Sequence, residues 1–267
     1  MIRLPCALYG AVTFIILNPL AFAADLGTTV PTPVTIAANW TGPYVGGSVA
    51  ERWAGMTWTT TGIGDFAGPA DATTTPASFN DSALRIGGFI GYNWQITPIW
   101  VVGLEADAVS GHSSKSLAGI PGTFGADGQG AGLTAINFDS SNVRLSWDGS
   151  VRGRVGALVT PTWLVYGTGG VTWQQVDINA ACNGSASNGS WCVAVRDVTV
   201  SRSRVGWTIG AGVETLLWNH LLLRAEYRYG DYGVINHTFF AATPNDQVVM
   251  TGSLRTNSGL IGLAYKF

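Results

Sequence analysis

The chain contains few charged residues and, after its N-terminal segment, no long apolar run. Only 11% of its 267 residues are charged, against about 25% in ordinary soluble domains. A transmembrane helix would need about 18 or more consecutive apolar residues, and no such run follows the N-terminal segment. These two absences argue against a typical soluble domain and against a helical membrane protein. If the chain enters lipid, it does so with strands, which must close into a barrel so that all backbone groups are paired.

Excess positive charge and metal-ligating residues are also scarce. The formal net charge is −2, with 14 Lys and Arg against 16 Asp and Glu, which argues against a nucleic-acid-binding surface. There are only three histidines, and they lack the spacing of metal ligands. We therefore expect no nucleic-acid partner, no metal site and no cofactor.

The N-terminal segment is typical of a secretory signal peptide. Arg3 supplies the positive charge, residues 7–20 form the apolar stretch, and Ala21 and Ala23 frame an A-x-A cleavage signal. Cleavage at this signal makes Ala24 the first residue of the mature chain. The sequence thus predicts export from the cytoplasm.

The mature chain then divides into two parts. Residues 24–40 contain prolines and threonines without periodicity and predict a flexible periplasmic lead-in, followed by a barrel over residues 41–267. Residues 1–23 are assigned to the signal peptide; the alternative is a membrane-anchoring helix, which Asn18 and Pro19 would interrupt.

Two cysteines remain after removal of the signal peptide, because Cys6 is lost with it. The remaining cysteines are Cys182 and Cys192. An even pair in an exported protein predicts one disulfide, with two free thiols as the alternative.

The mature chain contains eight strand-like segments, and in six of them apolar residues alternate with small or polar ones; the faces of 44–58 and of the glycine-rich segment 163–176 are left unassigned. The clearest runs from Leu84 to Ile96, with Ile86 and Ile90 on one face and Arg85 and Asn93 on the other. The predicted strands are 44–58, 84–96, 100–108, 143–159, 163–176, 204–214, 221–229 and 254–267. The long connections are 59–81, 112–141, 178–196 and 235–250, whereas those near Thr97, Thr160 and Trp218 are tight turns.

This pattern predicts an all-β protein, an eight-stranded antiparallel transmembrane β-barrel with apolar side chains outside. Long loops at one end and tight turns at the other are the asymmetry of outer-membrane barrels. A soluble, lipocalin-like barrel with its apolar faces inside is the rival, and periodicity alone does not distinguish the two.

Charged residues lie on the face opposite the apolar one, where the predicted lumen is. An eight-stranded barrel is just wide enough for side chains to fill, so these groups are expected to pair across the interior; a narrow, gated pore lined by them is the alternative. They are Arg85, Glu105, Asp107, Arg144, Asp148, Arg152, Arg154, Glu214, Arg224, Glu226 and Arg228.

Seven stretches of the chain carry a resemblance to a known family. They are WTGPYVGGSVA, IGGFIGYNWQI, VVGLEADAVSG, SVRGRVGALVTPTWLVYGTGGVTW, VGWTIGAGVE, LLLRAEYRYGDYG and GLIGLAYKF. In this order and spacing they resemble the small porin-like outer-membrane surface proteins of Gram-negative bacteria, which are related to the opacity proteins and to the transmembrane domain of OmpA. The resemblance implies a bacterial outer-membrane location.

The resemblance also implies a role for the end of the chain. Phe267, preceded by the alternating residues Tyr265, Leu263 and Ile261, looks like the signal that the outer-membrane assembly machinery recognises. The alternative is the ordinary end of a strand.

Catalytic and ligand-binding signals are weak. His112, Ser113 and Ser114 lie at a predicted rim, but no acid is fixed beside them, so we expect no enzyme. His112 and His237, both in predicted loops, could hold haem or another small ligand, as some relatives of the resembled family are thought to do.

The sequence therefore predicts a monomeric outer-membrane barrel with a structural, surface-related role in envelope integrity, loop display and possible adhesion. Its expected partners are outer-membrane lipid, lipopolysaccharide and the assembly machinery. A low-conductance channel is the second hypothesis and a haem or small-ligand binder the third.

Overall fold

The computed structural model describes residues 39–63, 76–121, 140–183, 194–218, 220–243 and 247–267. The predicted cleavage residues Ala21, Ala23 and Ala24, and Cys192, lie outside these ranges. No helix in the described part of the chain is long and apolar enough to cross a membrane. The strands are β1 (Gly42–Ile63), β2 (Ala77–Gln95), β3 (Trp100–Ser110), β4 (Ser113–Ala118), β5 (Ser140–Thr160), β6 (Trp163–Asn183), β7 (Val195–Trp218), β8 (Leu221–Phe239) and β9 (Val248–Lys266).

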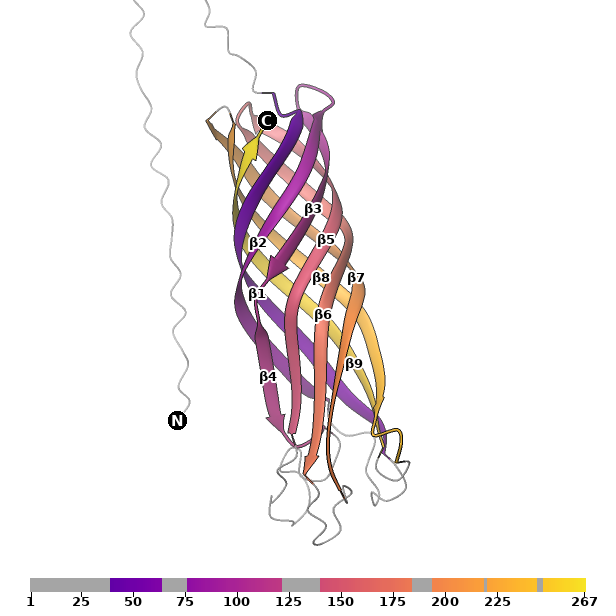
Figure 1. Cartoon of the computed structure of the whole chain (residues 1–267). Helices are drawn as coiled ribbons and strands as arrows, with labels where there is room; N and C mark the ends of the chain where they lie inside the picture. Colours follow the sequence, from indigo (N-terminus) through magenta and orange to yellow (C-terminus); the bar gives the residue numbers. More distant parts are fainter. Residues whose placement is uncertain (1–38, 64–75, 122–139, 184–193, 219, 244–246) are drawn as a thin grey trace, which may run out of the picture. The chain divides into compact units, whose positions relative to one another are not determined.

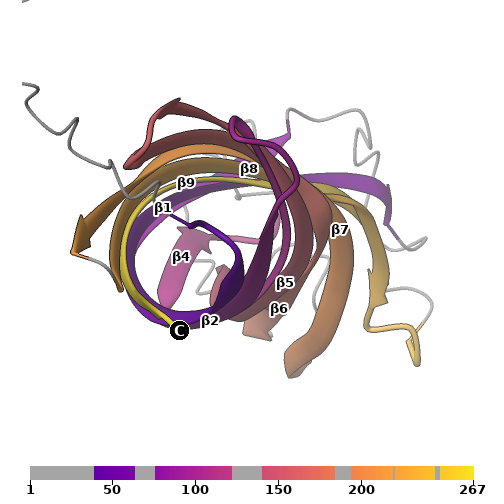
Figure 2. The same cartoon turned by 90° about the horizontal axis from the view of Figure 1, so that it is seen from above.

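The strands form a closed antiparallel ring (Figures 1 and 2). Their order is β3-β2-β1-β9-β8-β7-β6-β5-β4, and β3 also pairs with β5. Because β3 and β4 both pair with β5 along its length, they are two parts of one interrupted strand. The ring thus has eight strands, which confirms the predicted all-β, eight-stranded antiparallel barrel.

The two ends of the barrel differ. One end carries the tight connections between β2 and β3, β5 and β6, and β7 and β8, together with the C-terminus; we call it the turn end (Figure 1). We call the opposite end the loop end. Trp40 is buried at the turn end, where its indole donates to the carbonyl of Pro161. Trp40, the last residue of the predicted lead-in, thus packs against the barrel in the apolar cluster that includes Phe89 and Leu222.

The strands reach farther toward the loop end than the sequence predicts. β1 continues to Ile63, β6 to Asn183 and β8 to Phe239, so the predicted loops 59–81, 112–141, 178–196 and 235–250 are in part strand. The reason is a change in polarity along the barrel, which conceals these extensions from a search for outward apolar faces.

Near the turn end, apolar side chains face outward. Val49, Val151, Val155, Ile209 and Ile261 are each at least half exposed. Together with similar residues on the other strands they form an outward apolar band. Exposed Trp53, Trp147 and Trp207 mark its edge toward the loop end, as interfacial tryptophans do in membrane proteins.

Beyond these tryptophans the polarity is inverted. Met56, Trp58, Phe239 and Met250 are fully buried inside the loop-end half. The outward positions there carry polar residues such as Ser114, Asn142, Thr199, Ser201 and Ser253. This half therefore has the pattern of a soluble barrel, with apolar side chains inside and polar side chains outside.

Arg144 illustrates the inversion. It was predicted to face the lumen, but it is exposed, whereas Val143 and Leu145, predicted to face outward, are buried. A β-bulge in the β5–β6 ladder between Leu145 and Asp148 shifts the alternation by one residue. A one-residue shift exchanges the two faces of a strand.

The two halves of the barrel should respond differently to outward charge. Ala211 and Ser201 both point outward from β7, the first within the apolar band and the second beyond it. Ala211→Arg should destabilise the barrel in lipid by about 2–4 kcal/mol, the cost of an arginine near the bilayer midplane, while Ser201→Arg should change stability little. Urea unfolding in phospholipid vesicles measures both. Equal losses would show that the apolar band does not contact lipid.

Candidate functional site: the lumen

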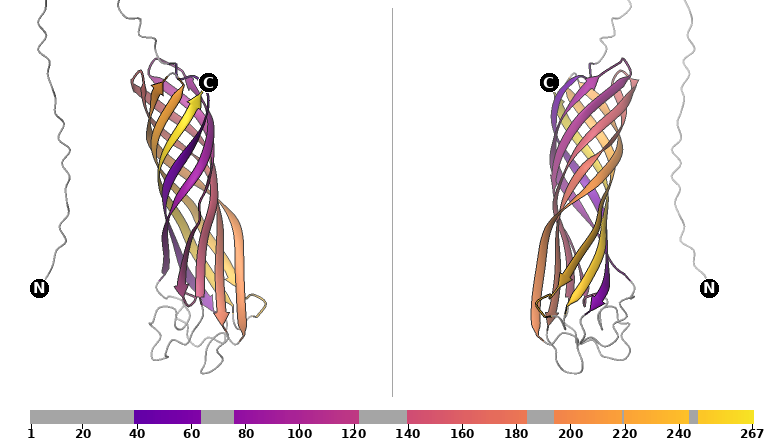
Figure 3. Two further views of the ribbon diagram at one scale, coloured as in Figure 1. Left: turned by 60° about the vertical axis from the view of Figure 1, so that its left-hand side comes forward. Right: turned by 90° about the vertical axis from the view of Figure 1, so that its right-hand side faces the viewer.

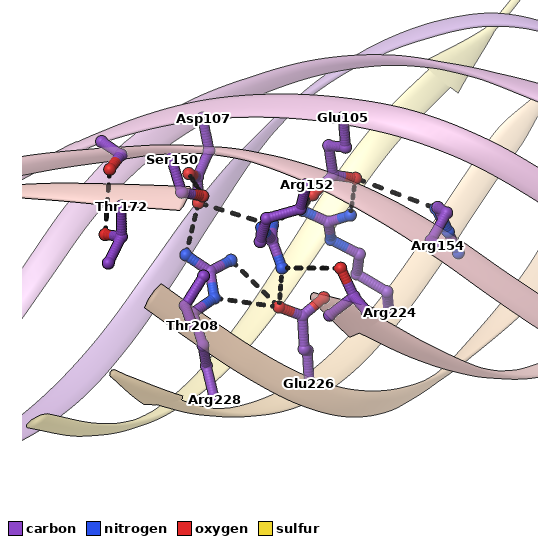
Figure 4. A network of polar contacts seen from close by, with 12 residues as sticks. Glu105, Asp107, Ser150, Arg152, Arg154, Thr172, Thr208, Arg224, Glu226 and Arg228 are labelled. Atoms are coloured by element: carbon purple, nitrogen blue, oxygen red, sulfur yellow. Dashed lines mark hydrogen bonds and ion pairs between the residues drawn. The ribbon is translucent and has the colours of Figure 1, made fainter. Parts of the chain in front are cut away.

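The interior of the barrel is filled in three tiers. At the turn end, Trp40, Phe89, Val101 and Leu222 belong to one apolar cluster. At the loop end, a larger apolar cluster contains Trp58, which stacks on Phe239 with ring centroids 5.4 Å apart. Between the two clusters lies a layer of charged side chains (Figure 4).

Glu105 of β3 lies at the centre of the charged layer. One of its carboxylate oxygens is 2.5 Å from a guanidinium nitrogen of Arg152, on β5. The other oxygen is 2.5 Å from a guanidinium nitrogen of Arg224, on β8 across the ring, and accepts a hydrogen bond from the hydroxyl of Tyr44 at 2.9 Å. Glu105 thus joins strands that are not neighbours.

Glu226 of β8 forms the second centre. Its carboxylate accepts from Arg152 at 2.6 Å, from Arg228 at 3.0 Å and from the hydroxyl of Tyr166 at 2.7 Å. Arg228 also pairs with Asp107 at 2.6 Å. Since Arg152 contacts both Glu105 and Glu226, the two centres form one network across the lumen (Figure 4).

Arg154 extends the network toward the turn end. It pairs with Glu214 of β7 at 2.9 Å and donates to the hydroxyl of Tyr44 at 3.1 Å. Its guanidinium lies 4.0 Å from the ring centroid of Tyr166. Arg224 similarly lies 3.5 Å from the ring centroid of Phe89. These cation–π contacts connect the charged layer to the turn-end apolar cluster.

Toward the loop end, Asp148 of β5 pairs with Arg85 and Arg52. Arg52 is nearly fully buried and also donates to Gln174 at 2.7 Å and to Ser113 at 3.0 Å. The sequence analysis missed Arg52. Arg52 lies on the face of β1 opposite to Val49 and Trp53, which point outward. Assigning the two faces of β1 from the sequence would therefore have identified Arg52 as a residue of the lumen.

Glycines on the strands make room for these large side chains. A Cβ at Gly46 would collide with the ring of Phe89, and one at Gly212 would lie 2.7 Å from the hydroxyl of Tyr166. The abundance of glycine, 36 residues, therefore allows a narrow lumen to hold arginines and aromatic rings together.

Ten of the eleven charged residues predicted to face the lumen form ion pairs there, and only Arg144 does not. The ten are Arg85, Glu105, Asp107, Asp148, Arg152, Arg154, Glu214, Arg224, Glu226 and Arg228. Each of the five carboxylates among them has an arginine partner. Buried charges cost much free energy unless they are paired, so this arrangement stabilises a filled lumen.

The other candidate residues do not converge on a site. Ser113 is buried and bonded to Arg52, whereas His112 is exposed. No group of three or more His, Cys, Asp or Glu in the described ranges could hold a metal ion. Cys182 is disulfide-bonded; its pairing with Cys192 stays a prediction, since Cys192 lies outside the described residues.

The C-terminal residues lie on the outer surface of β9. Ile261, Leu263, Tyr265 and Phe267 are all exposed. The backbone N–H of Phe267 donates to the carbonyl of Pro43 at 3.0 Å, so the chain end is fixed to β1 while its aromatic ring stays accessible.

The chain matches the model of the outer membrane protein beta-barrel domain over residues 20–267. It is 28% identical over 265 residues to the 31 kDa outer-membrane immunogenic protein of Brucella melitensis, covering 92% of this chain and 93% of the relative. It is 30% identical over 252 residues to the 25 kDa outer-membrane immunogenic protein of Brucella abortus, covering 92% and 91%. Among solved structures it is similar to the outer membrane protein OprG of Pseudomonas aeruginosa, with 12% identity, a TM-score of 0.48 and coverage of 87% and 99%.

The buried network should be far more sensitive to loss of one partner than a surface pair. Glu226→Gln leaves Arg152 and Arg228 short of a buried counter-charge, so it should destabilise the barrel by about 3–5 kcal/mol. The matched control is Arg255→Gln, because Arg255 is 64% exposed and pairs with Asp231 at 3.2 Å; its loss should cost less than about 1 kcal/mol. Denaturant unfolding of both variants in the same lipid gives the comparison, and similar values for the two would contradict a buried network.

Proposed function

The chain belongs to the outer membrane protein beta-barrel domain family and is an outer-membrane protein, and from this premise we propose that it is a sealed structural barrel that displays its loop end outside the cell. The turn end, with the C-terminus, then faces the periplasm, as the short turns of such barrels do. Its role is to contribute to envelope integrity and to carry its surface loops, which could support adhesion.

The filled lumen is the observation that carries this proposal. Arg152 connects Glu105 and Glu226 from opposite sides of the ring, and apolar clusters close the interior on both sides of this layer. An ion would have to displace buried side chains that are held by several charged contacts each. This supports a plug rather than the narrow channel that the sequence left open.

The loop-end half supports display. The strands continue past the tryptophans of the apolar band and bury their own apolar core, so this half does not need lipid to be folded. It holds the loops above the membrane surface. The matching Brucella relatives are named outer-membrane immunogenic proteins, which is consistent with exposure of this end to the outside.

We further propose that the barrel is a monomer without catalytic activity. Its partners are outer-membrane lipid and lipopolysaccharide around the band, and the assembly machinery, which would read Ile261, Leu263, Tyr265 and Phe267. His112 is exposed, whereas Ser113 is buried and accepts a hydrogen bond from Arg52, which gives no support to a serine nucleophile activated by a histidine base. Nothing in the described part of the chain calls for a cofactor or a nucleic acid.

Conductance distinguishes a plug from a channel. The purified barrel in planar lipid bilayers should show no discrete current steps, with a conducting porin reconstituted under the same conditions as the positive control. Insertion is verified by the shift in gel mobility on boiling, which reports a closed, detergent-resistant barrel. Current steps whose size changes in Arg152→Ala would sink the proposal and assign the lumen to a narrow pore.

The C-terminal residue should control assembly. Phe267→Ala removes an exposed ring that contacts Tyr265 with centroids 5.0 Å apart, so the amount of heat-modifiable barrel in the outer membrane should fall severalfold. Tyr227→Ala is the control, because Tyr227 is an exposed aromatic residue on β8, away from the chain end. If both variants assemble equally well, the chain end is an ordinary strand terminus.

A further inference from the structure

The ladders of the ring are interrupted at two places in the loop-end half. The β7–β8 ladder ends at the pair Trp207–Asp231, and the β2–β3 ladder ends at Ile86–Ser110. Among the described strands, β4 pairs only with β5. Beyond these points the strands form two four-stranded sheets, β4-β5-β6-β7 and β8-β9-β1-β2. Figure 3 shows β7, in orange, diverging from the neighbouring strand toward the loop end.

The outer face of the sheet β8-β9-β1-β2 is polar and carries little charge. Arg255 and Asp231, which lie on this face, pair with each other at 3.2 Å. Most other outward positions carry hydroxyl or amide side chains, which both donate and accept hydrogen bonds. Examples are Thr57, Ser78, Asn80, Ser82, Ser253 and Asn257.

A hollow lies on this face, over Gly55 of β1. It is open to the outside and has a volume of about 570 Å³, within the range of about 300–1,000 Å³ that is usual for small-molecule sites. An open hollow of this size is suited to one unit of a larger molecule. Its lining consists of Trp53, Ala54, Gly55, Asn80, Asp81, Ser82 and Asn257.

The strand ladders place the walls of the hollow. Trp53 is the direct partner of Ser82 on β2 and of Asn257 on β9, and Gly55 is the partner of Asn80. Direct partners in an antiparallel pair point to the same face, so these side chains surround Gly55 on the outside. A Cβ at Gly55 would lie 3.2 Å from Oδ1 of Asn80. The hollow is therefore open because residue 55 has no side chain.

Two of the walls are held in place by contacts outside the hollow. Oδ1 of Asn257 accepts a hydrogen bond from the hydroxyl of Tyr227 at 2.6 Å, which leaves the amide N–H groups of Asn257 to donate. The indole of Trp53 lies beside Gly259, where a Cβ would be 3.8 Å from its ring, and Trp53 is still 48% exposed. An accessible ring with a fixed neighbour loses little conformational entropy when a ligand packs on it.

Glu51 indicates the level of the hollow relative to the membrane. It alternates with Val49 and Trp53 and therefore points outward, one ladder row nearer the turn end than Trp53. An outward charge costs little near the membrane interface and more toward the bilayer centre. Exposed tryptophans also mark the interface. The hollow begins at Trp53 and extends toward the loop end, so it lies just outside the hydrocarbon.

Anchoring at the interface explains the exposure of Trp53 but not its surroundings. Trp207 is an anchor of this simple kind, since it is exposed at the edge of the apolar band and packs against Tyr229 with ring centroids 5.5 Å apart. An anchor needs neither a hollow nor adjacent amides. A pyranose sugar needs both, because its C–H face packs on an aromatic ring while its hydroxyls require donors and acceptors around that ring.

From these observations we propose that the hollow over Gly55 binds a neutral pyranose sugar, which packs on Trp53 and forms hydrogen bonds with Asn80, Ser82 and Asn257. The charged member of the lining is the carboxylate of Asp81, which disfavours phosphorylated or sulfated sugars. Core sugars of lipopolysaccharide and free glycans outside the cell both have the required chemistry. That the hollow lies outside the cell rests on the orientation proposed above.

The indole NMR signals of the barrel test the proposal. The full barrel is produced with isotopically labelled tryptophan, so that each of the 11 tryptophans contributes an indole N–H signal, and Trp53→Phe identifies the signal of Trp53. Spectra are compared in nanodiscs that contain lipid A alone, lipopolysaccharide with its core sugars, or lipid A with maltoheptaose added in solution. The Trp53 signal should shift with one of the two sugar sources, and the Trp207 signal should not.

Matched variants separate binding from folding. Gly55→Val fills the hollow with a side chain that suits a strand, so the barrel should keep its gel shift on boiling while the sugar-dependent shift of Trp53 falls about tenfold, as for a loss of about 1.4 kcal/mol in binding. Ser253→Val adds a similar side chain to the same outer face outside the lining. It should respond to sugar like the unchanged protein.

The pattern of shifts identifies the source of the sugar. A Trp53 shift with lipopolysaccharide alone assigns the site to core sugars in the membrane, and one with maltoheptaose alone assigns it to free glycans. Equal shifts of Trp53 and Trp207, or a Trp53 shift that persists in Gly55→Val, would overturn the site, and so would the absence of any shift. In each of these three cases a barrel that shows the gel shift and conducts no current keeps the structural role proposed above, so the two proposals fail separately.

Discussion

The structure depends on the narrowness of an eight-stranded ring. Such a ring has space inside for side chains and for little else, and within the membrane its outward face must be apolar. Polar side chains of the spanning strands therefore have to lie inside, and they have to satisfy one another there. The network around Glu105 and Glu226 is one solution, since a single arginine, Arg152, serves both carboxylates. The glycines opposite Phe89 and Tyr166 follow from the same lack of space.

Lipid imposes this rule only along part of the barrel. Beyond Trp53, Trp147 and Trp207 the surroundings of the strands change from hydrocarbon to water, and the side chains exchange sides: apolar residues such as Trp58 and Phe239 fill the interior. The transmembrane hypothesis and its soluble, lipocalin-like rival each describe one half of the same barrel. In both halves apolar and polar side chains alternate with period two along the strands. The halves differ only in whether the apolar side chains point outward or inward.

This explains which features could be predicted from the sequence. The predicted segments 84–96 and 204–214 lie mostly within the apolar band, and their faces were predicted correctly because their outward side chains are apolar and their inward ones small or polar. Arg144 was assigned to the wrong face because the β-bulge, and the switch of the apolar side chains from the outer to the inner face, both fall between Arg144 and Asp148. The strand extensions were taken for loops because their outward residues are serine, threonine and asparagine. Arg52 was missed because the faces of β1 were not assigned.

The extent of ring closure follows from the same change of surroundings. In hydrocarbon an unpaired backbone group has no alternative partner, so every ladder must be complete; in water the edge of a strand can be solvated. The β7–β8 ladder ends at Trp207 and the β2–β3 ladder at Ile86 and Ser110, both where the outward apolar band ends. The barrel is thus closed where lipid requires it. Outside the lipid the strands are free to separate, as β7 and β8 do beyond Trp207 and Asp231.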